Sequence, residues 1–419
     1  MTTESETLEQ RAEQFTLLLT DIAADQHHIV RTGIHMDELR PLRDTDFPED
    51  LYHLTDATPT GFYCYEDAGM TTGGFLAAQS IRYQVTGQAE AMASANRTFE
   101  GLRFIYNLGK PKQEGFFPKP YGLRMSNEIS RDQYIFVLAG LAAYHQIASA
   151  KRRVEIQRMA EKMAEYWISI DYCYSYFSIP STNHLKDYMG PLVLGLIGIA
   201  GLICGSDRIV RERNRLFKQE NLGIRMSETL REQFRQGQTY DGGMYFRQSE
   251  NAMMMKSMAV DHLWNADPGH YELWRRALQK FWDDDVLIQL DRGDGMNYWF
   301  IGYNPEKDHT FLTEPGVMPE LENPLNLPFL TWGGRRKHAG SVQVAYAATV
   351  IAHRLGLAKA SEVAADILWK MDQTKFRALT VPDANHLPPG CEWEQSVLHT
   401  CYMAYWLWSY WLGRQRQLW

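Results

Sequence analysis

The sequence predicts an all-α fold, a closed (α/α)6–7 toroid of sequential helical hairpins. Three observations lead to this class. Apolar residues recur with helical periodicity along most of the 419 residues. Successive helices are joined alternately by short turns and by long loops rich in glycine, proline and aromatic residues. Strand signals are sparse and do not alternate with helices, which disfavours a parallel α/β sheet.

The first five helices are predicted from apolar spacing and from their end signals. An amphipathic helix covers 6–25, and a helix rich in small residues covers 73–83 and is ended by Thr86-Gly87. The next spans about 88–108 and ends at a Gly-Lys-Pro stop. A Ser-Arg-Asp-Gln start then opens a helix at 130–148, and 152–168 supplies its partner.

The middle of the chain shows the same succession of helices joined by turns and loops. Helices are predicted at 185–204, 208–236, 252–264 and 268–281. The segment QTYDGGMYFRQ, at 238–248, is the one candidate β-hairpin, because an Asp-Gly pair stands at its centre.

The last predicted helices are 340–356, 359–372 and 393–413. No fixed-period repeat is visible, so a closed ring is favoured over an open helical solenoid. Because no linker composition interrupts the chain, residues 1–419 are expected to form a single catalytic domain.

Composition excludes some functions. The net charge of −8 disfavours a nucleic-acid partner, which would select a basic face. An anionic substrate stays open, because a basic cleft can lie on an acidic protein. The five cysteines show no zinc spacing and are expected to be buried thiols.

No membrane partner is expected. The start MTTESETLEQRAEQ has no apolar stretch of a secretory signal. The most apolar run, 189–204, is interrupted by glycine and is too short to span a bilayer. We expect a cytoplasmic protein, or a periplasmic or secreted one if the sequence has been processed. The aromatic C-terminal helix is expected either to pack inside the toroid or to form a homodimer contact.

No cofactor or metal is predicted. His27, His28 and His35 lie near one another but lack carboxylate or cysteine partners in a fixed frame. No Walker loop or dinucleotide fingerprint is present.

Two short segments carry the predicted chemistry. Asn183-His184 precede an apolar helix, and Arg292 and Tyr298 lie in the glycine-rich loop DRGDGMNYWFIGYNP. Each also has a structural interpretation: Asn183 as a helix cap, Arg292 as an ion-pair partner of Asp291 or Asp294, and Tyr298 as a packed ring. Together, however, an amide, an imidazole, a guanidinium and a phenol can neutralise a carboxylate and transfer protons. Those operations suffice for β-elimination from a polyuronate.

This set resembles that of the α/α-toroid polysaccharide lyases. Family 5 alginate lyases have an Asn-Asn-His step and an Arg that precedes a Tyr, with Thr182 standing here at the first Asn. The architecture as a whole resembles family 38, the glucuronan and alginate lyases. The resemblance implies that Asn183 neutralises the substrate carboxylate with Arg292 or a second His. It also implies that His184 is a base or neutraliser, and that Tyr298 protonates the leaving oxygen and can itself be the base. Its substrate would be a 4-linked anionic polysaccharide or oligosaccharide.

Further residues are candidate substrate contacts. The residues concerned are Glu66, Glu128, His262, Arg335 and His338. His262 can equally be a hydrogen-bonded core histidine, and the basic segment around Arg335 can equally be a solvated loop.

Two other functions compete with the lyase. Pairs drawn from Glu66, Asp67, Glu128 and Asp132 could act as general acid and base, an arrangement similar to that of unsaturated glucuronyl hydrolases. These acids could equally be helix-start residues favoured by the helix dipole. A helical binding protein with an aromatic concave face is the non-enzymatic alternative.

Overall fold

Six of the described helices form a closed inner ring. The computed structural model describes residues 7–49, 55–176, 179–183, 185–186, 190–228, 245–286, 300–304, 309–313, 340–377 and 392–419. The inner helices are α3 (Ala68–Thr86), α5 (Arg131–Ile147), α7 (Pro191–Cys204), α11 (Ser249–Ala266), α14 (Ser341–Leu355) and α16 (Thr400–Gln415). Each packs on the next in this order, and α16 packs on α3. The predicted all-α toroid is therefore confirmed, with six inner helices.

A second layer of helices surrounds this ring. The outer helices are α1 (Leu8–Leu17), α4 (Ala89–Gly109), α6 (Ala150–Ser169), α8 (Asp207–Lys218), α12 (Tyr271–Lys280) and α15 (Ala358–Lys370). Five of them follow their inner partner along the chain, whereas α1 comes from the N-terminus and packs on α16. Two short helices, α2 (Pro59–Tyr63) and α9 (Leu222–Met226), lie outside this pattern.

Small residues let inner helices approach closely. A Cβ at Gly73 of α3 would lie 2.7 Å from the carbonyl oxygen of Phe136, and one at Gly140 of α5 would lie 2.4 Å from that of Gly73. On the other side of α3, a Cβ at Gly74 would meet the Tyr405 ring at 3.2 Å. The Gly/Ala composition of these helices thus sets the tight contacts of α3 with α5 and α16.

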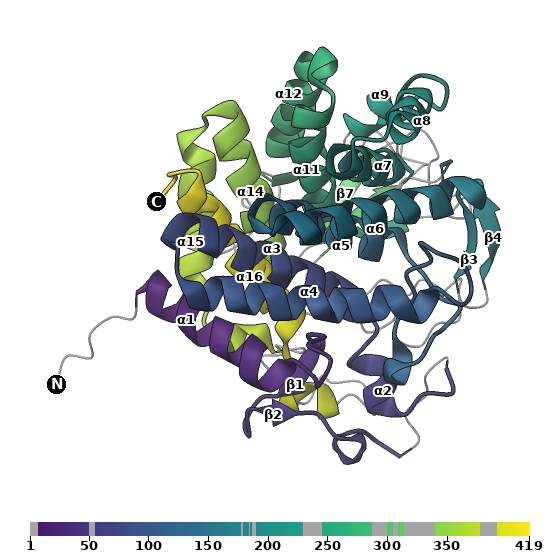
Figure 1. Cartoon of the computed structure of the whole chain (residues 1–419). Coiled ribbons are helices and arrows are strands. Elements are labelled where there is room, and N and C mark those ends of the chain that lie inside the picture. Colours follow the sequence, from purple (N-terminus) through teal and green to yellow (C-terminus); the bar gives the residue numbers. More distant parts are fainter. Residues whose placement is uncertain are drawn as a thin grey trace.

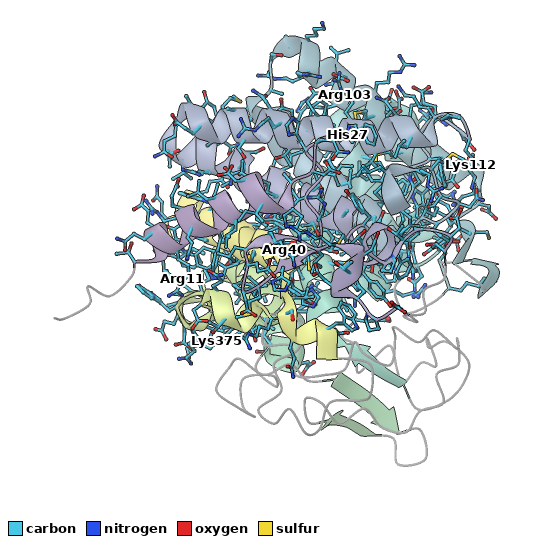
Figure 2. All side chains as sticks on the ribbon, turned by 90° about the horizontal axis from the view of Figure 1, so that it is seen from below. Arg11, His27, Arg40, Arg103, Lys112 and Lys375 are labelled. Atoms are coloured by element: carbon cyan, nitrogen blue, oxygen red, sulfur yellow. The ribbon has the colours of Figure 1, made fainter. Side chains whose placement is uncertain are left out.

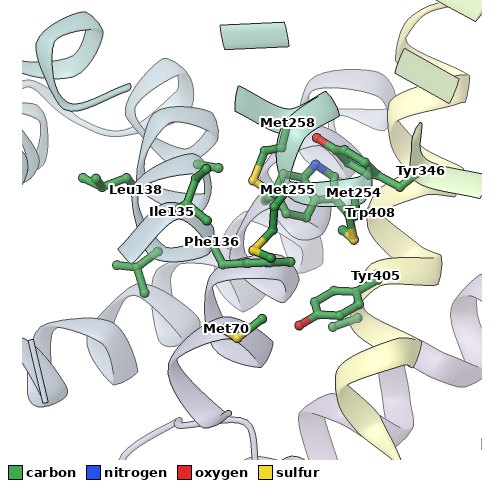
Figure 3. Close-up of a cluster of buried hydrophobic side chains, with 14 of the residues drawn as sticks. Met70, Ile135, Phe136, Leu138, Met254, Met255, Met258, Tyr346, Tyr405 and Trp408 are labelled. Atoms are coloured by element: carbon green, nitrogen blue, oxygen red, sulfur yellow. The ribbon is translucent and has the colours of Figure 1, made fainter. Parts of the chain in front are cut away.

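The centre of the ring is packed with side chains. Met254, Met255 and Met258 point from α11 toward Phe136 of α5 and Trp408 of α16, and each of the five is at most 3% exposed (Figure 3). A substrate therefore has to bind at one end of the ring.

Eight short strands form three small sheets among the described residues. The first joins β1 (Gly33–His35) to β2 (Arg40–Pro41) and β8 (Val397–His399). The second is the hairpin of β3 (Cys173–Tyr176) and β4 (Ile179–Asn183), and the third holds β5 (Tyr245–Gln248), β6 (Phe300–Asn304) and β7 (His309–Thr313). All pairings are antiparallel.

The first part of the hairpin predicted at 238–248 lies outside the described residues, and its last part, β5, pairs with β6. Two predicted helices need correction. The helix predicted at 208–236 ends at Lys218, because Asn221 has a φ of 57° and α9 begins after it. The last inner helix begins at Thr400, since 392–399 form a 3-10 turn and β8.

The described part of the chain includes no helix with both the length and the hydropathy to cross a bilayer. Cys64, Cys173 and Cys204 are free thiols; Cys64 and Cys401 are buried, whereas Cys173 and Cys204 are half-buried.

Candidate active site

The inner helices all begin at the same end of the ring. Contacts between α7 and α11 show this parallel direction. Gly195 of α7 lies against Ala259 of α11, and Gly198, further along α7, lies against Leu263, further along α11. The β3–β4 hairpin and α2, which precede inner helices, lie on the side of the molecule opposite the C-terminus (Figure 1). The described loops that lead into inner helices, such as 110–130 and the β3–β4 hairpin, therefore lie at this end. Residues 63–67, 119–133 and 393–405 form its best described part, which we call the α3/α5/α16 mouth.

A buried ion pair organises this mouth. The Lys119 side chain is 2% exposed, and its ammonium contacts one carboxylate oxygen of Glu66. Tyr121 donates its hydroxyl to the other oxygen. The backbone carbonyl of Glu66 accepts from Lys119 Nζ at 3.1 Å and from Gln133 Nε2 at 2.8 Å. Glu66 is thus fixed by groups that come from the 110–130 loop and from α5.

The charge of Lys119 is maintained by its neighbours. Burial acts to lower the pKa of Lys119, but Glu66 and Asp67 outweigh it and hold that pKa above its ordinary value. Lys119 is therefore a permanent cation under the first turn of α3.

Asp67 is the exposed acid beside this pair. It occupies the N-cap position of α3, where aspartate usually accepts a bond from the helix amides, yet its side chain makes no such bond. Its side chain is 49% exposed and one oxygen lies 3.8 Å from Lys119 Nζ. The carboxylate thus lies beside the Lys119 ammonium and does not cap its own helix.

Histidine and tyrosine side chains come from the start of α16. Among the described residues, His399 is the histidine that directly precedes an inner helix, and its ring lies 5.4 Å from that of Tyr402. Tyr402 in turn lies 5.9 Å from Tyr405. Burial, together with nearby groups that include Asp67 and Asp132, raises the pKa of Tyr405 well above its ordinary value. The phenol of Tyr405 therefore stays protonated and can only act as a neutral polar group.

An aromatic cluster lies next to these residues. The rings of Phe47, Tyr63 and Trp393 have centroids 4.8 to 5.6 Å apart. Burial and the charges of Glu394 and Glu66 raise the pKa of Tyr63. Tyr63 and Trp393 are half-buried, so they offer flat faces with polar edges, a surface that suits sugar rings.

The structure brings some predicted residues together. Glu66 and Glu128 both belong to the mouth, because the carbonyl oxygen of Glu128 accepts from Lys119 N at 2.8 Å. Asn183 ends β4, and its backbone pairs with Cys173 before α7 begins. The other predicted residues lie outside the described part of the chain: His184, Arg292, Tyr298, Arg335 and His338.

His262 lies elsewhere. It stands in the last third of α11, next to Asp261, and its Nδ1 is 2.9 Å from the carbonyl oxygen of Met258. Burial lowers the pKa of His262, which favours a neutral ring. Thirteen residues of helix, about 20 Å, separate it from the start of α11. The structure does not bring it together with Glu66 and Glu128.

Sequence reasoning missed Lys119, His399 and the two tyrosines of α16. Lys119 stands in FFPKPYG, an aromatic and proline-rich stretch in which a lone lysine is a weak signal. His399 and Tyr402 were hidden because the helix was predicted to start at 393, which made them interior helix positions.

Comparison with known proteins shows the fold. No family model and no curated protein matches the chain. The crystal structure of a D-mannose isomerase matches with a TM-score of 0.51 and 12% identity, over 97% of this chain and 99% of that one. The crystal structure of a sugar epimerase from a ruminal bacterium matches with a TM-score of 0.48 and 11% identity, over 95% and 98%. The chain is thus similar in fold to the D-mannose isomerase structure along nearly its whole length.

Proposed function

We propose that this protein is a carbohydrate-processing enzyme that moves a carbon-bound proton next to the carbonyl group of a neutral sugar, as an aldose–ketose isomerase or an epimerase. The observation that carries the proposal is the composition of the α3/α5/α16 mouth: carboxylates and half-buried aromatic rings beside a histidine. Such a surface binds hydroxyl groups and sugar faces and supplies an imidazole, a common proton-transfer group in enzymes.

The charge of this mouth favours a neutral substrate. In its described part the acids outnumber the lysines and arginines; the acids are Glu66, Asp67, Glu128, Asp132 and Glu394, against Lys119, Arg124 and Arg131. The Lys119 ammonium is already bound to Glu66. A polyuronate placed here would meet like charges, whereas the hydroxyl groups of a neutral sugar would meet acceptors.

The proposed reaction needs one base and polar contacts. His399 removes the proton from C2 of the open-chain aldose, and the electron pair forms an enediolate as the carbonyl oxygen gains negative charge. The Tyr402 hydroxyl is a donor near that oxygen, and Asp67 accepts a bond from a sugar hydroxyl. Return of the proton to C1, with transfer of the O2 hydroxyl proton to O1, gives the ketose. If the enediolate turns its other face to His399, return of the proton to C2 as the C1 carbonyl re-forms gives the epimer.

The fold of a D-mannose isomerase supports the choice of probe. D-Mannose and D-fructose are therefore the first substrates to test.

Lyase activity on glucuronan or alginate is the second candidate. It is favoured by the position of Asn183, since β4 leads toward the start of α7 and hence toward the same end of the ring. Paired-acid hydrolysis has less support from the geometry, because both carboxylate oxygens of Glu66 are bound by Lys119 and Tyr121.

One set of assays separates these reactions. The protein is incubated with D-mannose, D-fructose, D-glucose, glucuronan, alginate and unsaturated uronate disaccharides. Interconversion of the neutral sugars, seen by chromatography, is the expected result. A rise in ultraviolet absorbance on a polyuronate would instead establish elimination, and a fall on the disaccharides would establish hydrolysis. Binding without turnover would establish the non-enzymatic alternative.

A further inference from the structure

A buried lysine lies directly beneath the exposed acid of the proposed site. The Lys119 ammonium is the common partner of Glu66 and Asp67, and it bonds to both the carboxylate and the carbonyl of Glu66. Burying a charge is costly unless it is paired, so this side chain can occupy the position only with Glu66 in place.

The backbone of Lys119 is tied to the same region. Lys119 N donates to the carbonyl of Glu128 at 2.8 Å, and its own carbonyl accepts from Ser126 Oγ at 2.7 Å. The ammonium is therefore held on a braced loop and does not sit at the end of a mobile side chain.

Asp67 depends on this arrangement for its direction. An N-cap aspartate that bonded its own helix amides would turn its carboxylate onto α3, but Asp67 makes no cap bond. Its backbone still begins the helix, since its carbonyl accepts from Thr71 N at 2.9 Å and from Thr71 Oγ1 at 3.0 Å. The nearby cation offers the carboxylate an electrostatic alternative to the helix end.

We propose that Lys119 is a positioning residue that holds the Asp67 carboxylate off the α3 terminus and toward a sugar bound at the α3/α5/α16 mouth. The role of Asp67 as a sugar contact rests on the proposed function, whereas the placement of Asp67 by Lys119 does not. Lys119 itself does not touch the sugar.

The test uses four variants of the full chain. Lys119→Met removes the cation, Asp67→Asn removes the positioned charge, and the two are combined. Glu66→Gln with Lys119→Met removes both members of the buried pair, so no buried charge is left alone and the midpoint of thermal unfolding should recover. Lys112→Met is the matched control, because Lys112 lies on the same loop, is exposed, and bonds to Asn127 at 3.1 Å (Figure 2).

With D-mannose as the substrate, kcat/KM should fall on the order of 10²-fold in Lys119→Met, the scale of a misplaced contact. Adding Asp67→Asn should cause little further loss, and Glu66→Gln/Lys119→Met should recover stability without recovering kcat/KM. Lys112→Met should match the wild type. The proposal would be overturned if Glu66→Gln/Lys119→Met recovered both stability and kcat/KM. It would also be overturned if the losses in kcat/KM from Lys119→Met and Asp67→Asn were additive in the combined variant.

Hydrogen exchange at the start of α3 tests the positioning of Asp67 by Lys119 independently of the proposed reaction. The amides of residues 69 and 70, which the Asp67 carboxylate can cap once the cation is gone, should exchange more slowly in Lys119→Met and in Glu66→Gln/Lys119→Met but not in Lys112→Met. If wild-type protein turns over none of the sugars, this result supports positioning by Lys119 while the proposed reaction fails. Unchanged exchange in the Lys119 variants would overturn the positioning whatever the activity.

Discussion

At the residue scale, the buried charges of this chain are paired over long sequence distances. Glu66 was recognisable as an acid near a helix start, but its partner Lys119 lies 53 residues away, and no local pattern joins them. The same holds for Asp261 and its arginines. The sequence therefore identifies candidate side chains, whereas their pairing depends on which loops and helices the ring brings together.

Asp261 gives a residue-scale prediction of stability. It accepts from Arg354 Nε at 2.6 Å and from Arg416 Nη2 at 2.5 Å, and so joins the far ends of α11, α14 and α16. Burial opposes ionisation, but the two arginines outweigh it and hold the pKa of Asp261 well below its ordinary value. Asp261→Asn should lower the free energy of unfolding by about 3–5 kcal/mol near neutral pH, because two buried cations lose their partner.

The pH dependence of this difference has a definite sign. A carboxyl group whose pKa is lower in the folded than in the unfolded protein stabilises the fold fully at pH values above its unfolded-state pKa. This stabilisation is lost as pH falls and the folded carboxyl becomes protonated. The difference between the wild type and Asp261→Asn should therefore narrow as pH falls below about 4. Urea unfolding of the wild type and of Asp261→Asn at pH 7 and at pH 3 measures this difference in the free energy of unfolding. Asp366→Asn is the control, since its bond to Lys370 is exposed and should contribute no more than about 1 kcal/mol. Equal differences at both pH values would contradict the assignment.

At the element scale, helices were predicted well and their ends less well. Gly87, with a φ of 67°, ends α3 where the sequence indicated. The start of α3 is Ala68 and not 73, because glycines at 73 and 74 suit a close helix contact and do not mark a helix start. The β5–β6 pairing could not be predicted, since its strands are 51 residues apart along the chain.

The α3–α5 contact gives an element-scale prediction. Gly140→Ala would place a methyl group 2.4 Å from the carbonyl oxygen of Gly73, so the two helices would have to move apart. We expect a loss of about 1–3 kcal/mol in the free energy of unfolding despite the better helix propensity of alanine. Gly201→Ala is the matched control: its methyl group would meet Ile209 at an ordinary 3.5 Å and should be neutral or stabilising by up to about 1 kcal/mol. Unfolding of both variants in guanidinium measures their free energies of unfolding. Equal stabilities of the two variants would contradict the close contact between α3 and α5.

At the scale of the whole molecule, the ring is closed by the two ends of the chain. α16 packs on α3, and Arg11 of α1 donates to the carbonyls of Leu368, Trp369 and Met371 at the end of α15, at 2.7 to 3.2 Å. The toroid class was predictable from helical periodicity, because hairpins without strands leave few other ways to cover apolar faces. The docking of α1 on α15 was not predictable, since it uses a buried arginine that the sequence pattern places on the exposed face of an amphipathic helix.

Arg11→Met tests this closure. The variant keeps the aliphatic part of the side chain but leaves the α15 carbonyls without their donor, which should cost about 1.5–3 kcal/mol. If the chain is a single domain, circular dichroism and tryptophan fluorescence should report the same urea transition in the wild type and in the variant. Separate transitions for the two signals would contradict a single cooperative ring.

The central claim is that the mouth at the starts of α3, α5 and α16 transfers a carbon-bound proton of a neutral sugar. The most direct measurement is proton NMR of D-mannose in D₂O with the wild type and with His399→Gln. The wild type should replace or transfer the proton at C2 as D-fructose or the epimer forms, and His399→Gln should slow this about 10²–10⁴-fold while its unfolding midpoint stays near that of the wild type. An unchanged C2 proton signal with the wild type, or equal rates of C2 proton loss for the wild type and His399→Gln, would contradict this claim.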